Sequence, residues 1–197
     1  MNERRGPWTV TGKRTVYDTP WMQITDHDVI RPDGAPGVYG VMSPKNRALA
    51  ILPVHADGTI TLVGQHRFAT DHYSWEVPEG GGPKDEIPLD GARRELKEET
   101  GLTARSWQEI FRMDLSNSIT DEHAYGFLAM DLTQGEAEPE GTEVLSLRRV
   151  PFMSALQEAM SGQIKDALTI TILLRTYYMA REGELSPTIA QVLLGQD

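Results

Sequence analysis

The strongest constraint on the fold is a change of hydrophobic period near the middle of the chain. Up to Arg67 the sequence consists of short alternating segments separated by turn residues, which is typical of β-strands. Beyond that point Leu89, Ala92 and Leu96 recur at helical spacing, and Gly101 follows, a residue suited to end a helix in the left-handed conformation. The chain therefore places a sheet first and then an amphipathic helix.

The other predicted elements follow the same two patterns. We expect strands at 8–17, 21–30, 38–42, 49–54, 59–65, 104–115, 123–132 and 144–150, and helices at 88–100, 151–161 and 166–182. The turn residues Ala56-Asp57-Gly58 predict that the strands on either side of them form a hairpin. This order predicts an α+β protein with helices packed on a mostly antiparallel or mixed sheet.

Composition narrows the class of partner. The 197 residues are enough for one buried core with an appendage. They carry 19 Lys and Arg against 29 Asp and Glu, a net charge of −10, and the basic residues cluster only in interrupted pairs. A nucleic acid would meet general repulsion, so we expect no nucleic-acid partner.

The chain contains no cysteine, which excludes disulfides and thiolate metal sites. Its five histidines are scattered without metal-ligand spacing, so a zinc site is not expected. The charged N-terminus has no apolar stretch behind it, and no apolar run approaches the ~20 residues of a membrane helix. We therefore expect a cytoplasmic protein with no membrane partner.

Three acids share one face of the predicted helix. Glu95, Glu98 and Glu99 stand at positions i, i+3 and i+4, where unpaired like charges disfavour a helix. Either a hard cation such as Mg²⁺ or the basic residues of the same helix must compensate them. The helix taken alone favours a solvated acidic face.

A glycine-rich segment, Glu79 to Glu86, precedes this helix and is predicted to form a tight turn that lets backbone approach a ligand or ion. It is not a phosphate-binding P-loop, because Lys84 is followed by Asp85 and the glycine spacing differs.

Turn and helix together have the spacing of a known signature. The fixed positions are filled by Gly80, Glu86, Arg94, Glu95, Leu96, Glu98, Glu99, Gly101 and Leu102. This pattern resembles the signature of the Nudix hydrolase family. Upstream, Gln65-His66-Arg67 and the run from Trp75 to Gly80 look like the ADP-ribose and nucleotide-sugar pyrophosphatase branch, and the likeness spans about half the chain.

The resemblance implies a fold and a cofactor. The fold would be an α/β/α sandwich on a mixed sheet, with an extra N-terminal antiparallel sheet. Glu95 and Glu99 would be the principal ligands of Mg²⁺, for which Mn²⁺ could substitute. Glu98 would be a further ligand or an orienting catalytic acid, and the backbone carbonyl of Glu79 another ligand. Arg94 would pair with Glu98 or Glu86.

It also implies where the catalytic base and the substrate contacts lie. The base would come from the acidic loop between Glu136 and Glu143, with Glu140 the first choice, Glu143 the second and Glu138 the third. The alternative for this loop is a solvated segment without a catalytic role. Substrate contacts would come from Arg67, Glu76 and Trp21.

The implied reaction is metal-dependent hydrolysis of the pyrophosphate bond of ADP-ribose or of nucleoside diphosphate sugars. ADP-ribose hydrolases of this family often have a proline where this chain has Ser118, within the polar segment 115–122, so nucleotide sugars are kept beside ADP-ribose. That segment is polar enough to hydrogen-bond a sugar, and a plain turn is the alternative. The other interpretations are a hydrolase of nucleoside triphosphates or of another nucleoside diphosphate derivative, and a non-catalytic nucleotide-binding module.

We predict three parts of the chain. Residues 1–45 would form N-terminal strands that make a homodimer, with Trp8, Tyr17 and Trp21 as interface aromatics. Residues 46–182 would form the Nudix hydrolase domain, and residues 183–197 a C-terminal helical tail.

Overall fold

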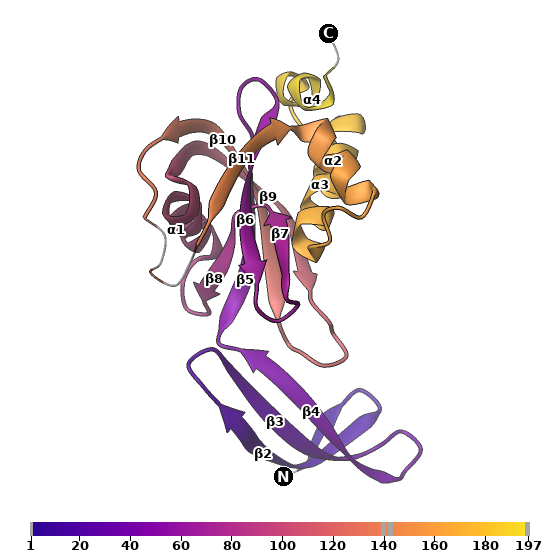
Figure 1. Cartoon of the computed structure of the whole chain (residues 1–197). Helices are drawn as coiled ribbons and strands as arrows, with labels where there is room; N and C mark the ends of the chain where they lie inside the picture. The colour runs from indigo at the N-terminus through magenta and orange to yellow at the C-terminus, as the bar shows by residue number, and fades with distance from the viewer. Residues whose placement is uncertain (1, 139–140, 142–143, 196–197) are drawn as a thin grey trace. The chain divides into compact units, whose positions relative to one another are not determined.

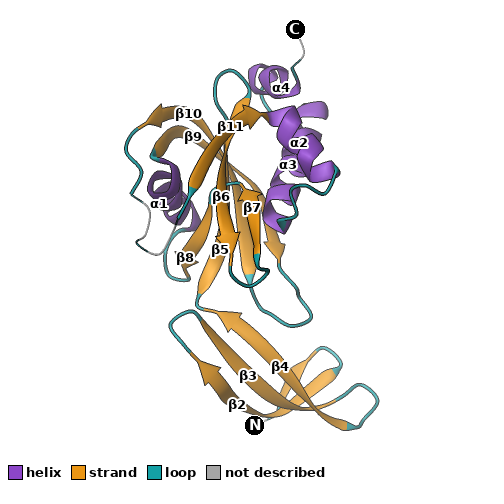
Figure 2. Cartoon of the chain, in the orientation of Figure 1, coloured by secondary structure: helices purple, strands orange, loops and turns teal. Residues whose placement is uncertain are grey.

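The computed structural model describes residues 2–138, 141 and 144–195. They form two compact units. The first comprises Met1–Arg47 with Met113–His123, and the second comprises Ala48–Arg112 with Ala124–Asp197. Figure 1 labels the elements of both units except β1, and Figure 2 colours them by type. The domain boundaries expected from sequence stay a prediction. That expectation did not include the grouping of residues 113–123 with the first unit.

The first unit is an antiparallel sheet whose strands are adjacent in chain order. They are β1 (Glu3–Arg5), β2 (Trp8–Asp18), β3 (Met22–Ile30) and β4 (Pro36–Pro44). Segment 113–123 is hydrogen-bonded to β4 and forms one isolated bridge with it, between Met42 and Thr120. Met42 N–H donates to Ile119 O at 2.9 Å, and the Tyr39 hydroxyl donates to Ser118 O at 2.6 Å. The predicted extra antiparallel sheet is therefore confirmed, and the polar segment 115–122 is in part bonded to it.

The second unit contains two sheets. The first has the order β8 (Glu79–Pro83), β5 (Asn46–Pro53), β10 (His123–Gln134) and β9 (Leu102–Asp114). The second has the order β11 (Ser146–Pro151), β6 (Thr59–Arg67) and β7 (His72–Glu76). Strands β5 and β10 pair in parallel, which makes the first sheet mixed, as the resemblance implied.

Helices lie on both sides of these strands. They are α1 (Pro88–Thr100), α2 (Phe152–Met160), α3 (Ala167–Arg181) and α4 (Pro187–Leu194). Figure 2 shows α1 on one side and the other three together on the opposite side, which gives the expected α/β/α arrangement. No helix in the described part of the chain is long and apolar enough to span a membrane.

Helix α1 forms where its periodicity predicted it. Ala92 and Leu96 are completely buried and pack in one cluster with Leu49 of β5 and Phe127 of β10. The helix ends at Gly101, whose φ of 71° is left-handed and whose N–H donates to Lys97 O. Burial of this apolar face, at about 25 cal/mol per Å² removed from water, attaches the acid-bearing helix to the sheet.

The structure corrects the hairpin predicted around Asp57. A turn does form, and Val54 bridges Ile60, but β5 and β6 then enter different sheets. The reason is burial, because residues Leu49 to Leu52 of β5 are fully buried without alternation. A strand covered on both faces, and paired in parallel with β10, belongs to the interior of a sheet.

Helix α4 falls within the predicted C-terminal helical tail and packs on the turn between β5 and β6. Gly58 in this turn has a φ of +77°, and a Cβ added there would lie 1.9 Å from Val192 O. The turn therefore excludes side chains for two separate reasons.

We predict that Gly58→Ala lowers the free energy of unfolding by about 3 kcal/mol, from left-handed strain and overpacking together. The control is Gly162→Ala, since Gly162 has a φ of +78° with nothing within 4 Å of an added Cβ. It should cost about 1 kcal/mol, from strain alone. Urea unfolding measures both, and equal losses would show that α4 does not pack on this turn in solution.

Candidate metal-dependent active site

The glycines of the glycine-rich segment lie in a strand, and the turn expected there comes after them, where Glu86 N–H donates to Pro83 O at 3.0 Å. Residues Glu79–Pro83 form β8, and Gly80, Gly81 and Gly82 all lack positive φ. Their function is to leave space. A Cβ on Gly80 would lie 2.0 Å from Glu95 Cδ, and one on Gly82 would lie 2.9 Å from Leu49 Cδ1. The absence of side chains lets β8 approach α1 at the acidic face.

The acidic face of α1 turns toward β8. Glu99 is only 4% exposed, and its Oε2 accepts a hydrogen bond from Glu79 N–H at 3.1 Å. Glu95 and Glu98 are each partly buried. A solvated acidic face does not describe this arrangement, because the innermost carboxylate is withdrawn from water and bonded to the strand.

Arg94 connects the acids to the strand. Its Nη1 donates to Glu95 Oε1 at 2.7 Å and to Glu98 Oε2 at 3.0 Å. Its Nη2 donates to Gly81 O at 3.0 Å and lies 3.6 Å from Glu86 Oε2. Burial opposes the charge, but the hydrogen bonds to Glu95 and Glu98 outweigh it and raise the pKa of Arg94. Both expected partners of Arg94 are therefore found beside it.

The donor atoms at this place suit a hard divalent cation. In the described part of the chain they are carboxylate oxygens and backbone carbonyls, without nitrogen or sulfur ligands. Among the described residues no three His, Asp or Glu side chains stand together as a ready metal cluster. The predicted bases Glu140 and Glu143 lie outside the described residues. The ligand set Glu95, Glu98 and Glu99 with the carbonyl of Glu79 thus remains a prediction.

The start of the acidic loop is bonded to α1. Glu138 N–H donates to Glu98 O at 3.0 Å, and Lys97 Nζ lies 3.1 Å from Glu138 Oε1. The third candidate for the base, Glu138, is therefore in an ion pair on the helix.

Arg67 and Glu76, both predicted to contact substrate, contact each other. Arg67 Nε donates to both carboxylate oxygens of Glu76 at 3.0 Å, and Nη2 also donates to Oε2. The side chain of Glu76 is 3% exposed, whereas that of Arg67 is 41% exposed. Burial opposes the charge of Arg67, but its hydrogen bond to Glu76 and the charge of that carboxylate raise its pKa. The arginine is thus held in place and remains accessible to an anion.

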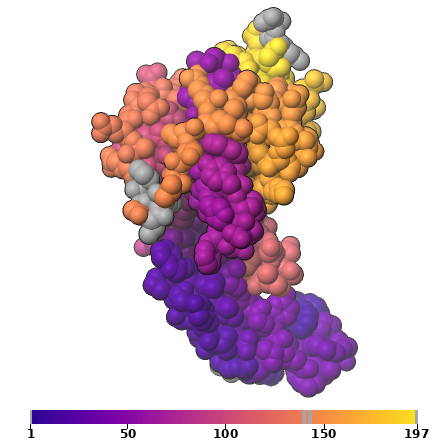
Figure 3. All heavy atoms as spheres, in the orientation of Figure 1, coloured from indigo at the N-terminus to yellow at the C-terminus, as the bar shows by residue number. Residues whose placement is uncertain are grey.

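A cavity of about 300 Å³ lies next to this pair. Its polar lining consists of Arg67, Thr70, His72, Ser74, Glu76, Lys165 and Asp166. Figure 3 shows the β6–β7 hairpin, in magenta, at the surface of the face in view. The cavity is therefore lined by Arg67 of this hairpin, whose guanidinium is held by Glu76.

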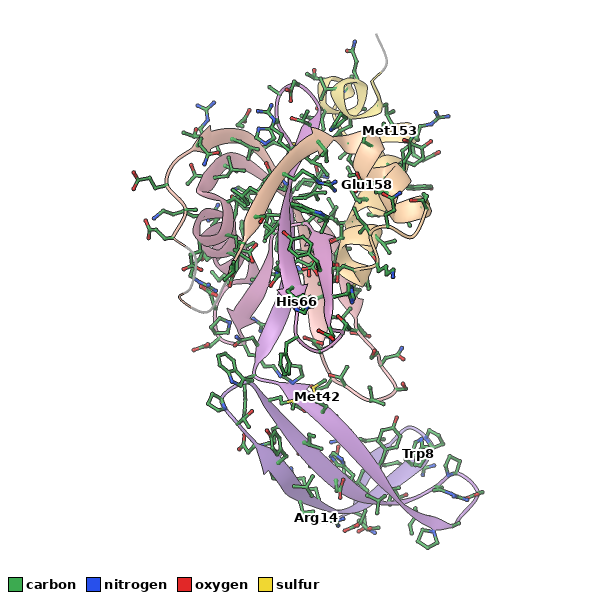
Figure 4. All side chains as sticks on the ribbon, viewed as in Figure 1. Trp8, Arg14, Met42, His66, Met153 and Glu158 are labelled. Atoms are coloured by element: carbon green, nitrogen blue, oxygen red, sulfur yellow. The ribbon has the colours of Figure 1, made fainter. Side chains whose placement is uncertain are left out.

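Trp75, from the segment that resembles the pyrophosphatase branch, anchors the second sheet to α2. Arg148 of β11 stacks on its ring at 4.6 Å. The same guanidinium bonds both carboxylate oxygens of Glu158, at 3.2 and 2.6 Å, and Figure 4 labels Glu158 on α2. These contacts hold β7, the strand that carries Glu76, against β11 and α2. Trp21 belongs to the other unit, where it is 77% exposed.

Sequence reasoning missed the side chain of Glu79. It is 10% exposed, and its Oε1 accepts from Thr169 Oγ1 of α3 at 3.2 Å. Burial, followed by the charge and hydrogen bond of Asp166, raises the pKa of Glu79 well above its ordinary value. The one local signal was Asp166, a residue type that favours the position before a helix. A contact across ninety positions leaves no periodic trace.

Two family models match the chain. The model described as NUDIX domain matches residues 44–169, and the model described as Nucleoside diphosphate sugar hydrolase N-terminal domain matches residues 8–42. The matched residues lie in both units of the structure and end at Thr169, near the start of α3. The predicted resemblance is therefore confirmed, and it extends to the N-terminal strands.

Individual relatives agree with these models. The chain is 30% identical to an ADP-ribose pyrophosphatase of Bacillus subtilis over 159 residues, 80% of this chain and 85% of the relative. It is 34% identical to a GDP-mannose pyrophosphatase of Salmonella arizonae over 140 residues, 65% of this chain and 71% of the relative. The crystal structure of an ADP compounds hydrolase matches with a TM-score of 0.79 at 21% identity, covering 90% and 97% of the two chains, which shows the shared fold.

We predict that Arg67→Ala lowers the free energy of unfolding by about 3 kcal/mol, because it leaves the buried carboxylate of Glu76 without its cation. The double variant Arg67→Ala with Glu76→Gln should recover most of the loss, since position 76 then carries no buried charge. Urea unfolding of both proteins measures this. A double variant as unstable as the single one would mean that packing, and not charge, sets the cost.

Proposed function

This chain belongs to the Nudix hydrolase family, and on that premise we propose that it hydrolyses the pyrophosphate bond of ADP-ribose or of nucleoside diphosphate sugars. The products are a nucleoside monophosphate and a sugar phosphate. The observation that carries the proposal is the close approach of Gly80 to Glu95, together with the bond from Glu79 to Glu99. Relatives named as ADP-ribose and GDP-mannose pyrophosphatases support this class of substrate.

Nudix hydrolases generally depend on a divalent metal. We propose Mg²⁺, with Mn²⁺ as a substitute, because the donors that the described residues offer at the acidic face of α1 are oxygens. Glu95, Glu98, Glu99 and the carbonyl of Glu79 would hold it. When bound, the metal would polarise the phosphoryl oxygens and lower the pKa of bound water.

Other groups of the chain act on the substrate and on the attacking water. Arg67, oriented by Glu76, would bind the diphosphate through paired N–H donors. A loop carboxylate would act as the base, with Glu140 the first choice and Glu143 the second. It would take the proton of the attacking water while the water oxygen bonds to phosphorus and the anhydride P–O bond breaks. The bond from Glu138 to Glu98 supports this choice, because it starts the loop beside the acidic face.

The first test is a panel of ADP-ribose, ADP-glucose, GDP-mannose, UDP-glucose and deoxynucleoside triphosphates, with Mg²⁺ and with chelator. Chromatographic separation of the nucleotides detects the products, because a coupling phosphatase would itself release phosphate from the triphosphates. We expect metal-dependent turnover of one or more diphosphate sugars, and a drop of at least about 100-fold in kcat for Glu99→Gln. Asp90→Asn is the matched control on the same helix, because Asp90 pairs with Arg93 instead.

In the same assay Glu140→Gln should lose more activity than Glu143→Gln, and Glu138→Gln should lose little. Tight nucleotide binding without turnover of any compound would contradict the proposal and assign the chain to the class of binding modules. Turnover confined to triphosphates would contradict the substrate class alone.

We also propose that the N-terminal unit makes a homodimer through its exposed aromatics, including Trp21 at 77% and Tyr17 at 49% exposure. Sedimentation equilibrium should give a dimer for the wild type and a weakened dimer for Trp21→Lys. Phe68→Lys is the control, since Phe68 is 98% exposed but lies in the other unit. A monomeric wild type at micromolar concentration would refute the proposal.

A further inference from the structure

Residues 77–80, which link β7 to β8 and include the first two residues of β8, are bonded to elements distant in sequence; they are called the β7–β8 connection below. Val77 N–H donates to Thr169 Oγ1 of α3 at 3.0 Å, and Ile51 N–H of β5 donates to Pro78 O at 2.9 Å. Val77 is buried, so its N–H has no access to water. The connection therefore depends on a side-chain hydroxyl for one of its backbone hydrogen bonds.

Thr169 uses its hydroxyl twice. The oxygen accepts from Val77 N–H, and the hydroxyl proton is donated to Glu79 Oε1 at 3.2 Å. Thr169 is 0% exposed, and its own N–H donates to Asp166 Oδ2 at 2.7 Å at the start of α3. One buried hydroxyl thus joins the first turn of α3 to two positions of the β7–β8 connection.

The connection is in turn adjacent to the acids of α1. Glu79 N–H donates to Glu99 Oε2, and Gly80 leaves no room for a Cβ against Glu95. This close packing leaves no room for β8 to shift against α1, because a shift of even a methyl-sized distance would create overlap on one side or a gap on the other. Movement of residues 77–80 would therefore move the Glu79 carbonyl relative to both carboxylates.

We propose that Thr169 is a positioning residue for the divalent-metal site. Acting through Val77 and Glu79, its hydroxyl holds the β7–β8 connection in register with Glu95 and Glu99. This inference rests on the proposed function for the identity of the ligands. Side chains that orient metal ligands without touching the metal commonly contribute tenfold or more to affinity.

The test compares Thr169→Val, which removes the hydroxyl at nearly constant volume, with Thr169→Ser, which retains it. Thr176→Val is the matched control. Thr176 is equally buried on the same helix, but its hydroxyl has no hydrogen-bond partner among the described residues. Free Mn²⁺ is measured by electron paramagnetic resonance without substrate, and kcat is measured against Mg²⁺ concentration.

We expect Thr169→Val to weaken Mn²⁺ binding by roughly 10-fold and to raise the Mg²⁺ concentration for half-maximal kcat similarly. At saturating metal its substrate KM should be unchanged. Thr169→Ser and Thr176→Val should bind Mn²⁺ like the wild type. If Thr169→Val does not fold, as judged by circular dichroism, Thr169→Ala carries the same expectation without a methyl group against Glu79.

Wild-type Mn²⁺ affinity in a folded Thr169→Val or Thr169→Ala protein would overturn the inference, as would an equal loss in Thr176→Val. The Mn²⁺ measurement involves no substrate. A wild type that binds Mn²⁺ but hydrolyses no nucleotide would therefore refute the proposed function and leave the role of Thr169 to be decided by the same binding data.

Discussion

The structure depends on the contact between a strand without side chains and a helix with an acidic face. Gly80 brings the backbone of β8 against the carboxyl group of Glu95, and any larger residue would separate the two elements. The apolar face of α1, represented by Ala92 and Leu96, packs on β5 and β10 and attaches the helix to the sheet. Hydrophobic burial thus attaches α1 to the sheet, and glycine lets the backbone of β8 come close to the carboxylates of α1.

Charge is the second constraint, because the gathered oxygens repel one another. Arg94 bonds Glu95, Glu98 and a carbonyl of β8, so one guanidinium neutralises part of the acidic face and also ties it to the strand. Arg67 does the same for the buried Glu76. Acids nevertheless outnumber these cations, and such a partly buried excess of carboxylates favours a divalent cation over water alone.

The features that could be predicted from the sequence are those that depend on interactions between residues close together in the chain. The bounds of α1 and the shared face of its three acids depend on local periodicity, and the structure reproduces both. The strand β8 was mistaken for a turn, because glycines needed for space look the same in sequence as glycines needed for positive φ. The bonds from Thr169 to Val77 and Glu79 join residues ninety positions apart, and no pattern in a single sequence records them.

The grouping of residues 113–123 with the N-terminal sheet bears on how such proteins diversify. Ile119 O and Ser118 O accept hydrogen bonds from β4, so the unit includes a segment encoded far from the four strands of its sheet. Recombination at a single junction near residue 46 would therefore transfer all four strands but leave behind the segment that bonds to β4. Inheritance of the whole unit, with these bonds intact, requires both of its chain segments to come from the same parent.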